Sequence, residues 1–252
     1  LFRSEDTGAR LVHCITGPAR GAGDAAHALG EAVLARFPEV TGFVHSVRRA
    51  PTAVALGERQ VMALGQDFLE ERFGTARLSV SADAFAQTNT QAAALLYGVA
   101  AKAAGSDPAG AAVDLYCGCG GIALSLAPQF ETVYGFEADK RAVADAARSA
   151  ELSGVGNAVF KTMDAAKGLE ELSGIAPAVA VLDPPRNGVA PEMIAALLSA
   201  APRKVVYVSC NPATLARDLK ALGELYAVTQ VTPVDLFPHT AHIEAVAELV
   251  LR

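Results

Sequence analysis

The chain has 252 residues, of which 52% are hydrophobic and 19% are charged, and its formal net charge at pH 7 is −6. This composition excludes a disordered or low-complexity chain and predicts one well-filled domain with a smaller partner. The negative charge argues against a protein that coats nucleic acid nonspecifically, because phosphate contacts need clustered Lys and Arg.

The first part of the chain, residues 1–78, has a mixed pattern. Two short alternating runs, LVHCIT and GFVHSV, flank an Ala-rich helical stretch near Asp24 to Phe37. The polar segment RRAPTAVALGERQ, residues 48–60, predicts a turn. We therefore expect a small, partial α+β domain over residues 1–78.

The second part, residues 79–252, alternates strands with helices. The helical pattern NTQAAALLYGVAAKAAG leads to AAVDLYCGCGG, where a buried strand meets a Gly-rich turn. The runs TVYGFEAD, NAVFKTMDA, AVAVLDPP and KVVYVSCNP predict further strands between helices, and hence a parallel sheet covered on both faces. The last 27 residues or so predict an antiparallel hairpin at one edge. An α/β, Rossmann-like sheet with such a C-terminal hairpin is typical of class I methyltransferases.

Polar residues follow the first three strands of this predicted sheet, where ligands of doubly wound folds bind. Asp114 and the glycines up to Gly121 form a tight turn after the first strand. Glu137 ends the second strand and is suited to accept hydrogen bonds from ribose hydroxyls. Asp164 follows the third. Each residue has a structural alternative, because Gly-rich turns also cap helices, a Glu at a strand end can simply be solvated, and Asp164 can cap the next helix.

Three reactive side chains follow the later strands. Asp183 precedes two prolines that fix the backbone. Cys210 precedes a helix whose amino terminus we expect to lower the pKa of the thiol, with a buried, inert cysteine as the alternative. Glu244 opens an apolar strand, and partial desolvation would make it a better proton acceptor. We expect no metal, since His239 and His242 lack a third ligand of matching spacing.

Five ordered motifs together resemble the RNA 5-methyluridine methyltransferase family, over roughly residue 44 to the end. They are FAQTN (85–89), DLYCGCGG, DPPRNG (183–188), SCNPATLARDL and FPHTAHIE. The resemblance implies S-adenosylmethionine as cofactor, an RNA-contacting role for residues 1–78, Cys210 as the nucleophile on carbon 6 of uracil, and Glu244 as the base that removes the proton from carbon 5. Expected cofactor contacts are Gln87, Tyr116, Gly121, Glu137, Asp164 and Asp183, and expected contacts with the target base are Phe85, Gln87, Asp183 and Arg186.

The sequence also departs from this family's pattern. Some relatives carry Asn at the position of Gly121, which would change a side-chain contact with the cofactor into a backbone contact. Members often carry an N-terminal RNA-binding β-barrel and, in some branches, an iron–sulfur cluster. Cys14 is isolated in a strand pattern, so we expect no cluster here. Because the chain starts at Leu1 without a secretory signal, we expect a fragment of a longer protein.

Several alternatives stay open. Ribosomal RNA is the expected substrate, with the transfer RNA T-loop as the other choice. Local basic pairs, Arg48 with Arg49 and Lys140 with Arg141, favour an RNA partner. An amino-methyltransferase, a non-catalytic nucleotide-binding module and a nicotinamide-dependent oxidoreductase are the competing hypotheses.

The cysteine usage indicates a cytoplasmic protein. No apolar run reaches the roughly 18 residues that a membrane span needs. We expect a monomer.

Overall fold

The computed structural model describes residues 1–49 and 57–252, and the chain divides into two compact units. The first unit comprises Leu1–Arg72 with Ser79–Phe85, and the second comprises Phe73–Leu78 with Ala86–Arg252. The boundary expected at residue 78 therefore falls inside a strand, β6, that both units share. Whether the units act as functional domains stays a prediction.

The first unit is built on a four-stranded sheet, in the order β1-β2-β3-β4. Its elements are β1 Phe2–Arg3, β2 Arg10–Thr16, α1 Ala22–Arg36, β3 Val40–Val47 and β4 Arg59–Gly65. The two predicted strands and the predicted helix are thus present, and β2 pairs parallel with β3. The turn expected over residues 48–60 lies largely outside the described residues. Sequence patterns did not anticipate β4 or the two-stranded pair of β5 Phe68–Phe73 and β6 Ala76–Ser81.

The second unit contains a seven-stranded sheet in the order β12-β13-β11-β10-β7-β8-β9. Its strands are β7 Asp107–Leu115, β8 Phe130–Glu137, β9 Ala158–Thr162, β10 Val179–Leu182, β11 Lys204–Ser209, β12 Tyr226–Val234 and β13 Glu244–Leu251. The first five pair in parallel, whereas β13 runs antiparallel between β11 and β12. This arrangement confirms the predicted α/β class and the C-terminal hairpin.

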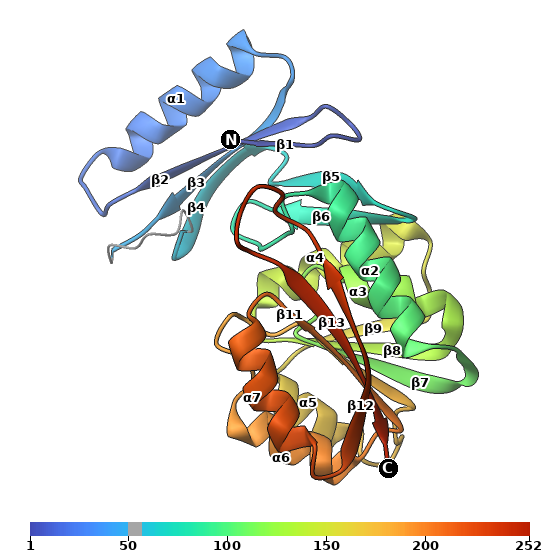
Figure 1. The fold of residues 1–252 in the computed structure, drawn as a ribbon. Coiled ribbons are helices and arrows are strands. Elements are labelled where there is room, and N and C mark those ends of the chain that lie inside the picture. The colour runs from blue at the N-terminus through green and yellow to red at the C-terminus, as the bar shows by residue number, and fades with distance from the viewer. Residues whose placement is uncertain (50–56) are drawn as a thin grey trace. The chain divides into compact units, whose positions relative to one another are not determined.

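Helices cover both faces of this sheet (Figure 1). They are α2 Thr90–Ala104, α3 Gly121–Leu126, α4 Lys140–Ser153, α5 Ala165–Glu171, α6 Pro191–Ala200 and α7 Pro212–Leu222, with a short 3-10 turn, η1, at Ala127–Gln129. Helices α2, α3 and α4 lie on one face, and α5, α6 and α7 lie on the other. In the described part of the chain, no helix is both long and apolar enough to cross a membrane.

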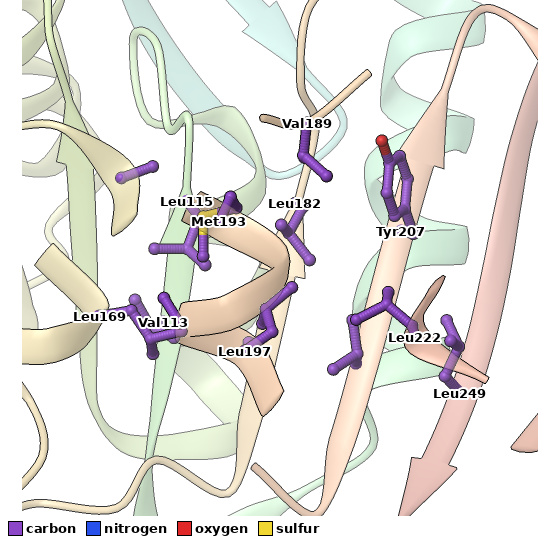
Figure 2. Packing of buried hydrophobic residues seen from close by; sticks show 14 of the residues in the cluster. Val113, Leu115, Leu169, Leu182, Val189, Met193, Leu197, Tyr207, Leu222 and Leu249 are labelled. Atoms are coloured by element: carbon purple, nitrogen blue, oxygen red, sulfur yellow. The ribbon is translucent and has the colours of Figure 1, made fainter. Parts of the chain in front are cut away.

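The core lies between the sheet and helices α5 to α7. Figure 2 shows Met193 and Leu197 of α6 packed near Leu115 and Leu182 of the central strands, all of them buried. Such burial contributes about 1.5–3 kcal/mol for each large apolar side chain. Because parallel strands buried on both faces need continuous apolar runs, segments such as VVYVS were readable from sequence. This core holds the strand ends in fixed register.

Polar caps begin the helices that follow these strands. Asp139, Asp164 and Asn211 are the N-caps of α4, α5 and α7, and each side chain accepts a hydrogen bond from a backbone N–H of the first turn. Such caps contribute about 1 kcal/mol each. They fix where each strand stops and its helix begins. The ends of the central strands therefore form one well-defined edge of the sheet.

Candidate active site

Cys210 and Glu244 are neighbours across two antiparallel strands. Ser209, the last residue of β11, pairs with Ala245 of β13. Cys210 directly follows Ser209, and Glu244 directly precedes Ala245, so the register places the two residues opposite each other at the carboxyl edge of the sheet. Glu244 is buried, at 3% exposure, and Cys210 is half-buried.

Asp183 reaches the same edge from the next strand. It follows β10, whose Leu182 pairs with Leu115 of β7 and with Tyr207 of β11. Burial and the negative charge of Glu244 raise the pKa of Asp183 to about 7. Burial also raises the pKa of Glu244, while the positive charge of Arg186 lowers it. Two desolvated carboxyl groups and one thiol therefore share this edge.

The environment of the Cys210 thiol corrects one expectation. The helix after Cys210 was expected to lower the pKa of the thiol, but the pKa is raised. Burial is the main cause, the carboxylates of Glu244 and Asp183 add to it, and the charge of Arg186 only partly offsets them. The thiol of the free protein is thus held protonated and must lose its proton before it can act as a nucleophile.

The loop after Asp183 is tied to α7 by its backbone. The carbonyl of Arg186 accepts hydrogen bonds from Asn211 Nδ2 at 3.2 Å and from Thr214 Oγ1 at 3.3 Å. The buried carboxylate of Asp218 accepts from the N–H of Val189 at 3.0 Å and from the Tyr207 hydroxyl at 2.7 Å. These contacts hold Arg186 beside the strand that carries Cys210. Asp218 and Tyr207 had no role in the sequence-based prediction, although Asp218 lies in the SCNPATLARDL motif.

The turn after β7 brings Tyr116 and Glu137 together. Tyr116 has a positive φ of 72°, and its N–H donates to the carbonyl of Phe136 at 3.0 Å. Glu137 accepts from the N–H of Gly118 at 3.2 Å and from the N–H of Asp139 at 3.0 Å. Each carboxylate oxygen keeps a free lone pair for a ligand. Asp164 accepts from two backbone N–H groups as the cap of α5, which is the structural alternative weighed for it, and a cofactor role for Asp164 stays a prediction.

The FAQTN segment divides between the two units. Gln87 is buried, at 9% exposure, and within the described chain its amide makes no hydrogen bond to protein. Asn89 caps α2 and donates from Nδ2 to the carbonyl of Leu236 at 3.1 Å, which ties this segment to the loop that leads to Glu244. Phe85 belongs to the first unit, and its side chain is 74% exposed. The site roles of Gln87 and Phe85 stay predictions.

Asp114 was expected in the turn after the first strand, but it lies within β7 and is fully buried. Its Oδ2 accepts the N–H of Ala123 at 2.8 Å, whereas its enclosed Oδ1 has no hydrogen-bond partner among the described residues. Burial raises its pKa to about 8, and Asp183 contributes. A buried polar atom without a partner is costly, which makes Oδ1 a candidate contact for a ligand, and a cation bound there would displace the proton of Asp114.

Replacing Asp114 with Asn should change how stability depends on pH. Because the folded state raises the pKa of Asp114, it binds the proton more tightly than the unfolded chain between about pH 4 and pH 8. The free energy of unfolding of the wild type should therefore fall as the pH rises through this window. The Asp114→Asn variant lacks this acid, so its free energy of unfolding should fall less over the same pH window, by an amount on the order of a few kcal/mol. Urea denaturation at several pH values across this window tests the prediction.

The matched control is Asp24→Asn, at an exposed position in the first turn of α1. Its free energy of unfolding should follow the wild-type pH dependence. Parallel curves for wild type and Asp114→Asn would contradict the assignment of a buried, protonated acid at this position.

Other candidate ligands give no further site. Within residues 1–49 and 57–252, no group of three or more His, Cys, Asp and Glu side chains is placed to hold a metal ion. The four cysteines are free thiols, and Cys14 lies on β2. His239 and His242 lie in the exposed turn before β13.

Comparisons with known proteins find a family model that covers most of the chain and curated relatives named as RNA methyltransferases. A sequence model described as tRNA (Uracil-5-)-methyltransferase matches residues 52–251. An uncharacterized RNA methyltransferase of Nitratidesulfovibrio vulgaris is 44% identical over 95% of this chain and 52% of its own length, and one of Listeria innocua is 40% identical over 85% and 48%. The chain spans about half the length of these curated relatives.

Among solved structures, similarity extends over nearly the whole chain. The Pyrococcus abyssi tRNA (uracil-54, C5)-methyltransferase in complex with S-adenosyl-L-homocysteine aligns with a TM-score of 0.78 and 28% identity, over 98% of this chain and 58% of that protein. The Pyrococcus abyssi Trm5b structure aligns with a TM-score of 0.59 at 14% identity, which supports the fold alone.

Proposed function

Because the chain belongs to the tRNA (uracil-5-)-methyltransferase family, we propose that it transfers a methyl group from S-adenosylmethionine to carbon 5 of a uracil in RNA. The observation that carries the proposal is the pairing of Ser209 with Ala245, which brings Cys210 and Glu244 together. A nucleophile and a base on opposite strands can flank one planar ring. An amino-methyltransferase would need neither a thiol nor a partner carboxylate here.

The residues at the carboxyl edge fit this cofactor. Asp114 has an unsatisfied buried oxygen, and Gly118 and Gly120 adopt positive φ, which lets the backbone approach a ligand closely. We propose that the cofactor is held by these residues together with Gln87, Tyr116, Gly121, Glu137, Asp164 and Asp183. When bound, S-adenosylmethionine supplies the methyl group from its sulfonium.

Cys210 and Glu244 then have complementary roles. The Cys210 thiol gives its proton to a carboxylate at the same edge, such as Asp183, and its sulfur forms a bond to carbon 6 of uracil. The electron pair of the carbon 5–carbon 6 double bond then makes carbon 5 nucleophilic. After carbon 5 has gained the methyl group, Glu244 accepts its remaining proton. The released electrons re-form the double bond and expel the thiolate of Cys210. Asp183 and Arg186 are proposed to contact the uracil, with Phe85 as an aromatic contact.

Ribosomal RNA is the proposed target, as expected above, and transfer RNA is the second candidate. The second candidate is favoured by the likeness to the Pyrococcus abyssi transfer RNA enzyme. The basic pairs Arg48–Arg49 and Lys140–Arg141 are candidate backbone contacts, and a cytoplasmic monomer is the form proposed to act.

The deciding experiment maps 5-methyluridine in ribosomal and transfer RNA from cells with and without the gene. Loss of a modified position from ribosomal RNA is expected. Loss of 5-methyluridine from transfer RNA alone would make transfer RNA the target. No loss from either RNA would contradict uracil methylation.

A further inference from the structure

Tyr97 is the one aromatic residue of α2, and it packs directly on Gly121. A Cβ added to Gly121 would lie 2.6 Å from Tyr97 Cε2 and 3.0 Å from its hydroxyl oxygen. The ring also contacts Phe73, with 5.9 Å between the two ring centroids. Gly121 is the first residue of α3, directly after the Gly-rich turn. Tyr97 therefore fills the space that a side chain at position 121 would occupy.

The hydroxyl of Tyr97 lies in a polar cluster without a partner of its own. The side chain is 7% exposed, and within the described residues the hydroxyl makes no hydrogen bond. Burial raises the pKa of Tyr97 well above its ordinary value, and Cys119, Asp183 and Asp114 add to the shift. The phenol thus stays protonated and can donate. A hydroxyl that donates to nothing in the described protein lies beside the first turn of α3, whose Ala123 N–H bonds to Asp114. With the unpartnered Oδ1 of Asp114, this hydroxyl points to a ligand that contacts both groups.

We propose that Tyr97 is a cofactor-binding residue: from α2 it takes the place that a side chain at position 121 would hold, and its hydroxyl donates a hydrogen bond to the methionyl carboxylate of S-adenosylmethionine. This inference rests on the proposed cofactor. The methionyl end carries an ammonium group, which suits a carboxyl acceptor such as Asp114, and a carboxylate, which suits a phenol donor. Tyr97 explains how a chain with Gly at position 121 still offers a side-chain contact there.

The test compares two ligands on the Tyr97→Phe variant by calorimetry. S-adenosylhomocysteine contains the methionyl carboxylate, and 5′-methylthioadenosine lacks it. Removing the hydroxyl while keeping the ring should raise the Kd for S-adenosylhomocysteine about tenfold or more. The Kd for 5′-methylthioadenosine should not change, and neither should the melting temperature without ligand. The control Tyr134→Phe, on β8, should leave both affinities at wild-type values.

The remaining outcomes contradict the inference in separable ways. Unchanged affinity of Tyr97→Phe for S-adenosylhomocysteine would show that the hydroxyl does not contact it. Equal weakening for both ligands would reduce Tyr97 to a packing role. Wild-type protein that fails to bind S-adenosylhomocysteine would overturn the proposed cofactor itself.

Discussion

Replacing Cys210 with alanine should abolish methylation of uracil, with a loss of turnover on the order of 10⁴-fold or more. The reason is that carbon 5 of uracil becomes nucleophilic only when a sulfur atom bonds to carbon 6. Affinity for S-adenosylhomocysteine should stay near the wild-type value, since Cys210 lies at the end of β11 and not in the turn after β7. Single-turnover assays with radiolabelled S-adenosylmethionine measure the loss.

The matched control is Cys14→Ala, which removes a free, half-buried thiol on β2 of the first unit. Its turnover should equal that of the wild type. RNA that contains 5-fluorouracil should form a covalent adduct with wild type and Cys14→Ala, but not with Cys210→Ala. Substantial turnover by Cys210→Ala would favour direct methylation of an amine and refute the covalent mechanism.

The second unit could be predicted because its physical signals are local. The parallel strands read as largely apolar runs, the most deeply buried being β10 and β11, and each ends in a polar or Gly-rich segment that stops the strand. Strand ends in a parallel sheet meet at one edge, so Glu137, Asp183 and Cys210 could be grouped from the amino-acid sequence alone. The N-cap role of Asp164 is predictable for the same reason, since capping depends on a few neighbouring residues.

The first unit could be predicted only in part. In β5, FLEERF, charged residues interrupt the apolar pattern, and buried Glu71 accepts hydrogen bonds from the N–H groups of Glu5 and Asp6. That pairing joins residues 65 or more positions apart. No window of sequence contains both partners, so the strand looks like a polar segment when read alone.

The electrostatics of the site also depend on distant residues. The helix after Cys210 is local and suggested a lowered pKa, whereas Glu244 and Asp183 come from other strands and raise it. The contact of Tyr97 with Gly121 also depends on distant residues, because it follows from the packing of α2 on α3 and has no motif in the sequence. The Ala-rich helix offered one signal, a single aromatic residue among small ones, which reads equally well as core.

Replacing Glu244 with glutamine should stall the reaction after methyl transfer. Glutamine keeps the size of the side chain but cannot accept the proton from carbon 5, so turnover should fall on the order of 10²- to 10⁴-fold. The methylated ring should then stay bonded to Cys210, and a protein–RNA adduct should accumulate with ordinary uracil. Denaturing gels with labelled RNA detect this adduct. Glu248→Gln, a half-buried position on the same strand, should turn over normally without adduct.

The pH dependence separates Glu244 from a merely structural carboxyl group. Burial raises its pKa above the ordinary value for glutamate, and Arg186 only partly reverses the shift. Because the active base is the deprotonated form, the rate of adduct breakdown should increase with pH through this raised pKa. The acid limb of the pH–rate profile for adduct breakdown should therefore lie at a higher pH than a solvated glutamate would give. In Glu244→Gln the residual breakdown should lose this limb. A variant that kept the limb would assign the titration, and with it the base, to another group such as Asp183.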